Sequence, residues 1–246
     1  ELSSEKVDTT EWKIDKTYVT ADSYLHPVID LIIKSGAFPL TRHTQAKVLC
    51  IGLGGGALNS MLHHFFPEMD ITVIEYNALM ISMAKKWFGL EVNAHHRVML
   101  DDGIKFIMEE VKLGSNYDIV FLDACDSRAT DAEFVCPVTG FLDDKVVEGI
   151  AQLVGLHVEK KFTRIESQHQ IAAAVSFPGT LIMNVASLKM TADELEEFMM
   201  SRLSKVFKHC STQQTTASIN KIYSCSQQYN GREDIALPLF INITVL

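Results

Sequence analysis

A short apolar segment that ends in a cluster of glycines is the feature that most constrains the fold of this chain. Residues 48–51 are apolar, and Gly52, Gly54 and Gly56 occur within the next five positions. A second apolar run ends at Glu75, 23 positions after the first glycine. Glycine permits a tight turn and a close approach of backbone to ligand, and an acid at this distance can bind ribose hydroxyls. The spacing predicts a βαβ unit that binds an adenosine-containing ligand.

The glycine loop alone leaves the class of ligand open. Gly52, Gly54 and Gly56 form a GxGxG pattern, whereas Gly52, Gly54 and Ala57 form the GxGxxA pattern of dinucleotide-binding enzymes. The loop is therefore compatible with S-adenosylmethionine and with a nicotinamide cofactor. A strand-to-helix turn without a ligand is the third alternative, although four glycines in five positions lose much backbone entropy on ordering.

Regular alternation of apolar runs and helical segments predicts the fold class. Five buried strands are expected, at about 47–52, 71–75, 97–100, 117–122 and 180–185. Strands that alternate with helices indicate a parallel sheet with helices on both faces. Residues 209–217 and 219–226 alternate between polar and apolar side chains and predict an antiparallel pair at the sheet edge. We expect an α/β protein with a seven-stranded, mostly parallel, Rossmann-like sheet.

Residues 1–36 are predicted to form an N-terminal extension, and residues 37–246 the Rossmann-like domain. Within the extension, residues 11–19 indicate a short strand or hairpin, and residues 23–34 indicate a helix that ends before Gly36. A further helix is predicted near residues 165–175, in a long connection that we expect to serve packing or oligomer contacts.

The composition limits the classes of function. A chain of 246 residues that is 47% hydrophobic and 22% charged is typical of one globular α/β domain. Its net charge of −9 argues against a broad surface for nucleic acid, and no apolar run approaches the roughly 18 residues of a membrane span. The cysteines lack CxxC spacing, which indicates reduced thiols, no metal site and a cytoplasmic location: Cys50, Cys125, Cys136, Cys210 and Cys225.

The ends of the third and fourth predicted strands carry acids. Asp102 and Gly103 follow the third strand, where the carboxylate can bind the adenine amine or can cap the following helix. An acid–glycine pair at this point favours S-adenosylmethionine over a nicotinamide cofactor. Asp123 ends the fourth strand, and Asp126 follows three positions later. These two acids can hold an ammonium group, accept its proton and balance a sulfonium charge, although Asp126 can also be an ordinary turn residue.

The order of these motifs resembles the spermidine-synthase-like branch of class I methyltransferases over roughly residues 15–227. The resemblance implies the class I methyltransferase fold, S-adenosylmethionine or its decarboxylated form as cofactor, and an amine as acceptor. It also places Tyr24 at the acceptor site. The spacing of Asp123 and Asp126 is that of aminopropyl transfer, but His26 stands where the polyamine enzymes have an acid. The glycine loop likewise reads GLGGG where those enzymes carry GGGDGG.

The leading prediction is a methyltransferase that uses S-adenosylmethionine to modify a protein amine, at a lysine or at an N-terminus. The predicted acceptor-site residues are Asp123, Asp126 and Tyr24. The predicted cofactor-site residues are Gly52, Gly54, Gly56, Glu75, Asp102, Gly103 and Asp123. The alternatives are an aminopropyltransferase acting on a diamine, a nicotinamide-dependent oxidoreductase, and a non-enzymatic module that retains the pocket. The resemblance leaves a homodimer open.

Overall fold

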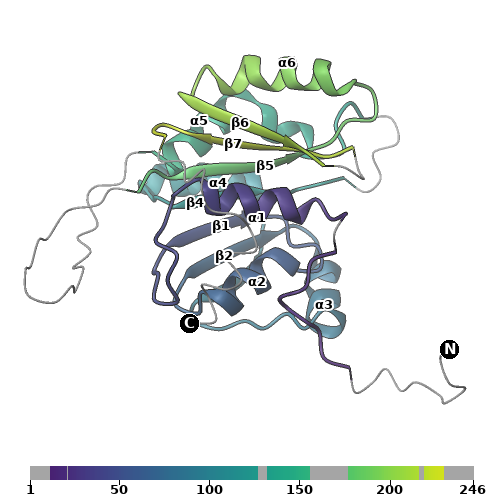
Figure 1. Cartoon of the computed structure of the whole chain (residues 1–246), viewed down its shortest axis with the longest axis vertical. Coiled ribbons are helices and arrows are strands. Elements are labelled where there is room, and N and C mark those ends of the chain that lie inside the picture. Colours follow the sequence, from purple (N-terminus) through teal and green to yellow (C-terminus); the bar gives the residue numbers. More distant parts are fainter. Residues whose placement is uncertain (1–11, 21, 127–131, 156–176, 216–218, 230–246) are drawn as a thin grey trace, which may run out of the picture.

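The computed structural model describes residues 12–20, 22–126, 132–155, 177–215 and 219–229. The described strands form one sheet flanked by helices (Figure 1). The strands are β1 (Lys47–Ile51), β2 (Asp70–Glu75), β3 (His96–Leu100), β4 (Ile119–Leu122), β5 (Thr180–Val185), β6 (His209–Gln214) and β7 (Lys221–Ser226). The helices are α1 (Leu25–Lys34), α2 (Ala57–Phe65), α3 (Ala78–Trp87), α4 (Gly103–Leu113), α5 (Asp144–Leu153), α6 (Ala192–Leu203) and the 3-10 helix η2 (Thr139–Leu142).

The sheet has the strand order β3-β2-β1-β4-β5-β7-β6. The first five strands in this order are parallel, and β7 runs antiparallel between β5 and β6. The predicted mostly parallel, seven-stranded sheet with an antiparallel edge is confirmed.

The two faces of the sheet bury two separate apolar cores. Along β1, Val48 and Cys50 pack with residues of α1 and α2, whereas Leu49 and Ile51 pack with residues of α4 and α5. Successive strand side chains point to opposite faces, so a strand covered on both sides must be apolar throughout. The continuous apolar run in the sequence is therefore the direct consequence of burial between two helical layers.

Three helices begin at side-chain caps. Asn77 accepts a hydrogen bond from the backbone N–H of Leu79 at the start of α3. Thr191 and Glu194 form a capping box at the start of α6. Both caps agree with the local sequence, because a short polar side chain before an apolar helical pattern satisfies otherwise unpaired N–H groups. Asp102 caps α4 in the same way.

The predicted strand or hairpin near the N-terminus is not found within residues 12–20, which contain a turn. Asp15 Oδ1 accepts hydrogen bonds from the backbone N–H and the hydroxyl of Thr17, at 2.8 and 2.6 Å. Such local bonds compete with strand pairing. The following helix is confirmed as α1, whose Val28 and Ile32 join the core on one face of the sheet. The helix predicted near 165–175 lies outside the described residues.

Four cysteines form disulfides, so the expectation of reduced thiols is wrong for this structure. Cys210 and Cys225 are paired positions on β6 and β7, with their Cα atoms 4.2 Å apart. Cys125 and Cys136 have their Cα atoms 4.3 Å apart, and Cys136 bridges to the residue that follows β5. The register between β6 and β7 brings Cys210 and Cys225 together, and the bridge beside β5 brings Cys136 close to Cys125. Neither pairing can be read from the spacing of the cysteines along the sequence. Cys50 is buried and free.

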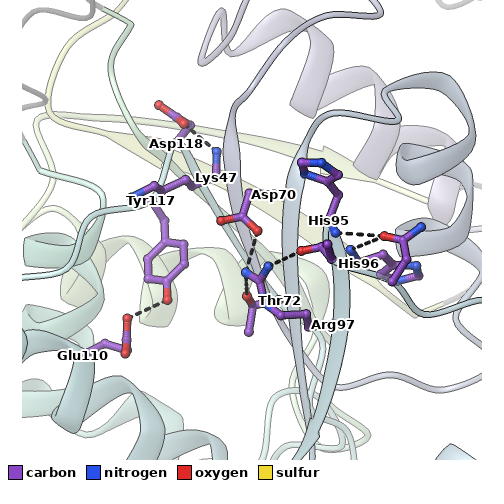
Figure 2. A network of polar contacts seen from close by, with 11 residues as sticks. Lys47, Asp70, Thr72, His95, His96, Arg97, Glu110, Tyr117 and Asp118 are labelled. Carbon is purple, nitrogen blue, oxygen red and sulfur yellow. Dashed lines mark hydrogen bonds and ion pairs between the residues drawn. The ribbon is translucent and has the colours of Figure 1, made fainter.

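A network of polar contacts joins the amino-terminal ends of several strands (Figure 2). Arg97 on β3 bridges to Asp70 and Thr72 on the neighbouring β2, at 2.5 and 2.9 Å. The backbone N–H of Lys47 donates to Asp118 at 2.7 Å. These contacts fix the edge of the sheet that lies away from the predicted site.

Among the described helices, none is long and apolar enough to cross a membrane.

Candidate cofactor and acceptor site

The predicted site residues gather where the parallel strands end. Strand register aligns Ile51 at the end of β1 with Ile74 on β2 and Leu122 on β4. Glu75 at the end of β2 is in turn aligned with Leu100 at the end of β3. The residues that follow these strands therefore lie along one edge of the sheet, which is where open α/β sheets bind their ligands.

The glycine loop after β1 requires glycine at its first position. Gly52, Gly54 and Gly56 have φ angles of +98°, +53° and +76°. A Cβ atom on Gly52 would lie 2.4 Å from the backbone oxygen of Asp123, a distance that real Cβ atoms do not reach. The absence of a side chain thus lets the loop pass directly beside the end of β4. This contact joins the predicted cofactor loop to the predicted acceptor residue.

Glu75 holds the glycine loop against the start of α3. Its Oε2 accepts a hydrogen bond from the backbone N–H of Leu53 at 2.9 Å, and its Oε1 accepts one from Asn77 at 2.7 Å. Each carboxylate oxygen has two acceptor positions, so one on each oxygen remains for a ligand hydroxyl. Tyr76 and Leu100 are large apolar side chains exposed beside this carboxylate. The arrangement offers a bidentate acceptor next to an apolar surface, which suits a ribose attached to a flat base.

Asp102 is an exposed helix cap, and Gly103 is a packing position. Asp102 Oδ1 accepts from the backbone N–H groups of Ile104 and Lys105, at 2.8 and 3.0 Å. The capping alternative is therefore confirmed, and Oδ2 stays available, among the described contacts, for an amine. A Cβ on Gly103 would lie 2.6 Å from the side chain of Ile51. Helix capping by Asp102 and close packing at Gly103 thus explain the acid–glycine pair structurally. The sequence alone does not distinguish these roles from a role in binding.

Asp123 is the centre of the candidate acceptor site. Tyr24 donates its hydroxyl to Oδ2 at 2.7 Å, and the Asn184 side chain donates to Oδ1 at 2.7 Å. Burial raises the pKa of the Asp123 carboxyl, and the two hydrogen bonds oppose that shift. Burial and the negative charge of Asp123 raise the pKa of Tyr24, so this phenol remains a neutral donor. The predicted meeting of Tyr24 and Asp123 is present, although 99 positions separate them.

Asn184 and Asn220 are site residues that sequence reasoning missed. The amide nitrogen of Asn220 donates to Asn184 Oδ1 at 2.8 Å, which leaves the Asn184 amide nitrogen to face Asp123. Asn184 is 1% exposed. The signal was present in the apolar run of β5, where a buried amide near the carboxyl end of the strand requires a polar partner. Asn220 lies directly before β7 and gives no comparable signal.

Asp126 lies on the loop after β4, beside one of the disulfides. It is half-buried, and its backbone N–H donates to the carbonyl of Val135 at 2.9 Å. Its role at an acceptor stays a prediction. Asp123, Cys125 and Cys136 are the one group of potential metal ligands among the described residues. Because the two sulfurs are bonded to each other, they do not offer thiolates to a metal.

The strand order and the placement of the strand-end residues define a Rossmann-like fold of the class I methyltransferase type. The crystal structure of human methyltransferase-like protein 13 in complex with SAH matches with a TM-score of 0.64. The match covers 91% of this chain and 90% of that chain at 20% identity, so it shows the fold. The fold implied by the resemblance is confirmed.

The curated proteins that are similar in sequence include several eEF1A lysine and N-terminal methyltransferases and a polyamine aminopropyltransferase. An eEF1A lysine and N-terminal methyltransferase homolog of Drosophila melanogaster is 29% identical over 143 residues, which are 58% of this chain and 21% of that protein. A polyamine aminopropyltransferase of Vibrio vulnificus (strain CMCP6) is 30% identical over 96 residues, which are 35% of this chain and 32% of that protein. The chain thus spans about a fifth of the first relative and a third of the second. No protein-family model matches the chain.

Proposed function

We propose that this chain is a methyltransferase that uses S-adenosylmethionine to modify a protein amine. The observation that carries the proposal is the buried Asp123 carboxylate, held by Tyr24 and Asn184 and placed directly beside the glycine loop. The two halves of such a reaction, cofactor and acceptor, would then meet at the end of β4.

The residues around the glycine loop fit the cofactor. Gly52, Gly54 and Gly56 would allow close approach of the ligand, and Glu75 would accept the ribose hydroxyls. Asp102 Oδ2 would accept the adenine amine while Oδ1 continues to cap α4. When bound, S-adenosylmethionine supplies a methyl group that its sulfonium already activates. The protein's task is therefore alignment, charge balance and removal of a proton.

Asp123 is suited to orient an amine and to take up its proton. A lysine amine has a pKa near 10.4, so it arrives protonated at neutral pH and must lose a proton before it can act as a nucleophile. Tyr24 and Asn184 occupy one acceptor position on each Asp123 oxygen, which leaves positions for the amine. Burial raises the pKa of the carboxyl, and this makes it a stronger proton acceptor than an exposed aspartate. Asp126 would add a second negative charge near the same group.

The proposed acceptor is a lysine or N-terminal amine of elongation factor 1A, as in the names of the methyltransferase relatives. Aminopropyl transfer to a diamine is the second candidate, because the Asp123–Asp126 spacing and the aminopropyltransferase relative favour it. His26 weighs against it, since it carries no negative charge where a diamine needs one.

The test is a transfer assay with both donor–acceptor pairs, read by mass spectrometry. The pairs are S-adenosylmethionine with elongation factor 1A, and decarboxylated S-adenosylmethionine with putrescine. We expect methyl addition to the protein, a loss of at least about a hundredfold in Asp123→Asn, and no change in Asp193→Asn, which alters an exposed acid on α6. Aminopropyl addition instead would move the assignment to the second candidate, and no transfer in either pair would overturn both.

We further propose a cytoplasmic location and a homodimer. Modification of a translation factor supports the first, whereas the two disulfides weigh against a strongly reducing compartment. Thiol trapping in intact cells decides whether these cysteines are oxidised there, and light scattering on the purified chain gives the oligomeric state.

A further inference from the structure

A polar cavity of about 160 Å³ lies at the amino-terminal edge of the sheet, away from the proposed cofactor site. It is lined by Lys16, Ser60, His63, His64, Glu91 and His96. His96 begins β3, whereas the cofactor residues follow the strand ends. Since a strand rises about 3.3 Å per residue, this five-residue strand separates the two places by roughly 15 Å. The cavity is therefore a site of its own.

The protonated nitrogen of His63 follows from its neighbours. Asn93 Oδ1 accepts hydrogen bonds from the backbone N–H groups of His95 and His96, at 2.8 and 3.0 Å. This fixes the Asn93 amide nitrogen as the group that faces His63 Nε2, at 2.8 Å. Nε2 must then accept, so a neutral His63 carries its hydrogen on Nδ1. That Nδ1 is buried and has no hydrogen-bond partner among the described residues.

His96 and Ser60 repeat this pattern deeper in the wall. The side-chain nitrogen of Asn59 lies 2.8 Å from His96 Nε2, and with the amide in this orientation the ring hydrogen is on Nδ1. His96 is 1% exposed and Ser60 is 6% exposed. His96 Nδ1 and the Ser60 hydroxyl make no hydrogen bond of ordinary geometry within the described part of the chain, and the backbone of Glu91 lies close enough to the His96 ring to raise its pKa. Burial lowers the pKa of both His63 and His96, so each ring is a neutral donor.

The one cation in the lining adds further donors. Lys16 Nζ lies 2.7 Å from Glu91 Oε1, and the Glu91 side chain is 75% exposed at the rim. An ammonium has three donors, and this contact uses one of them. The lining thus combines two imidazole N–H groups, a hydroxyl and an ammonium with His64 and the Glu91 carboxylate, whose charge the Lys16 ammonium balances. A single water molecule accepts at most two such bonds, whereas an oxyanion offers only acceptors.

We propose that this cavity binds a small oxyanion, a carboxylate or phosphate group, through Lys16, Ser60, His63 and His96. The unpartnered buried N–H groups, whose tautomer Asn93 fixes in the case of His63, are the observation that carries the assignment. The site does not depend on the proposed methyl transfer. Its ligand is either free in solution or the anionic group of a larger molecule.

The test titrates the ¹⁵N-labelled full chain with inorganic phosphate and, separately, with acetate. The readouts are the imidazole N–H resonances and calorimetry. We expect saturable shifts of the His63 and His96 Nδ1–H signals with at least one probe. Lys16→Gln and Ser60→Ala should each weaken binding about tenfold, whereas Lys13→Gln, at a neighbouring exposed lysine, should leave it unchanged.

The two probes separate the sources of the anion. Preference for phosphate would assign the site to phosphorylated ligands, and preference for acetate to carboxylates. No saturable shift with either probe would overturn the proposal and make the cavity a hydrated one. Equal binding by the wild-type chain, Lys16→Gln and Ser60→Ala would also overturn it. Neither result would bear on the cofactor site, which the same samples report through titration with S-adenosylhomocysteine.

Discussion

The Asp123 carboxyl shows how a single residue can be both costly to the fold and useful to the chemistry. Its pKa is raised because burial disfavours the charged form, and two donated hydrogen bonds recover only part of that cost. Tyr24 and Asn184 are neutral, so they hold the carboxylate without cancelling its charge. A charged amine that enters the site would supply the missing countercharge. Binding of the acceptor and stabilisation of Asp123 are therefore one event in this account.

The unfolding free energy of the wild-type chain should fall as the pH rises and Asp123 ionises, and Asp123→Asn should make this fall smaller. A carboxyl whose folded pKa exceeds its unfolded value of about 3.9 stabilises the folded state least when it is ionised. The wild-type chain should therefore lose stability relative to the variant as the pH rises from about 4 through the folded pKa. Asparagine can keep both neighbours, since its oxygen accepts from Asn184 and its amide donates to Tyr24. Urea unfolding between pH 4 and 8 measures the difference, and parallel curves would contradict it.

His96 should produce the opposite dependence on pH. Burial, followed by repulsion from His63 when that ring is also protonated, lowers the pKa of His96 from 6.5 to about 4. Because His96 is buried in its neutral form, the folded chain loses stability as the pH falls from 6.5 through 4. At 1.36 kcal/mol per pKa unit the loss is roughly 3 kcal/mol. His96→Gln should remove this loss in acid unfolding experiments, whereas His209→Gln, on the exposed face of β6, should retain it.

At the scale of elements, the sequence predicted strands and helices where burial dictates the pattern. The central strands β1 and β4 are apolar from Val48 to Ile51 and from Ile119 to Leu122 because both faces are covered, whereas the edge strand β3 is mostly exposed. The caps of α3 and α6 follow from unpaired N–H groups. The predicted N-terminal strand is wrong within 12–20 because local side-chain bonds of Asp15 replace strand pairing. The disulfides were missed because partner choice depends on register between strands, which no local pattern contains.

Alanine at two glycines of the same loop should have unequal effects. In Gly52→Ala the new Cβ meets a backbone oxygen at 2.4 Å, and the φ of +98° adds strain. We expect a loss of more than about 2 kcal/mol in unfolding free energy. In Gly54→Ala the Cβ meets no described atom within 4 Å, so only the cost of a left-handed residue remains, about 1 kcal/mol. Equal losses in urea unfolding would show that the loop does not approach the end of β4 as described.

The disulfide between β6 and β7 should stabilise the sheet edge. Cys210 and Cys225 are 15 positions apart, and closing a loop of that length restricts the unfolded chain by about 3 kcal/mol. Reduction with a dithiol should therefore lower the unfolding free energy of the wild-type chain. The decrease should be about 3 kcal/mol larger than the decrease in the double variant Cys210→Ala/Cys225→Ala. If reduction affects both proteins equally, the bond does not form in solution.

At the scale of the whole molecule, the candidate site exists because five parallel strands end on one edge. This explains why Gly52, Glu75, Asp102 and Asp123 could be placed together from the sequence: each lies at the end of a predicted strand or within two positions after it. Tyr24 was placed by the family resemblance, and its contact with Asp123 is present. Asn184 and Asn220 could not be placed as readily, because their roles depend on β7 lying antiparallel beside β5. The sheet topology, more than any single motif, assembles the acceptor side.

Calorimetric titration with S-adenosylmethionine tests the central claim most directly, with its decarboxylated form, S-adenosylhomocysteine and NAD as comparison ligands. We expect binding of S-adenosylmethionine and S-adenosylhomocysteine in preference to the other two. Glu75→Gln should weaken that binding at least about tenfold, since it replaces a charged acceptor of the ribose hydroxyls. Glu148→Gln, at an exposed acid on α5, should leave it unchanged. Preference for NAD, or unchanged affinity in Glu75→Gln, would contradict the account.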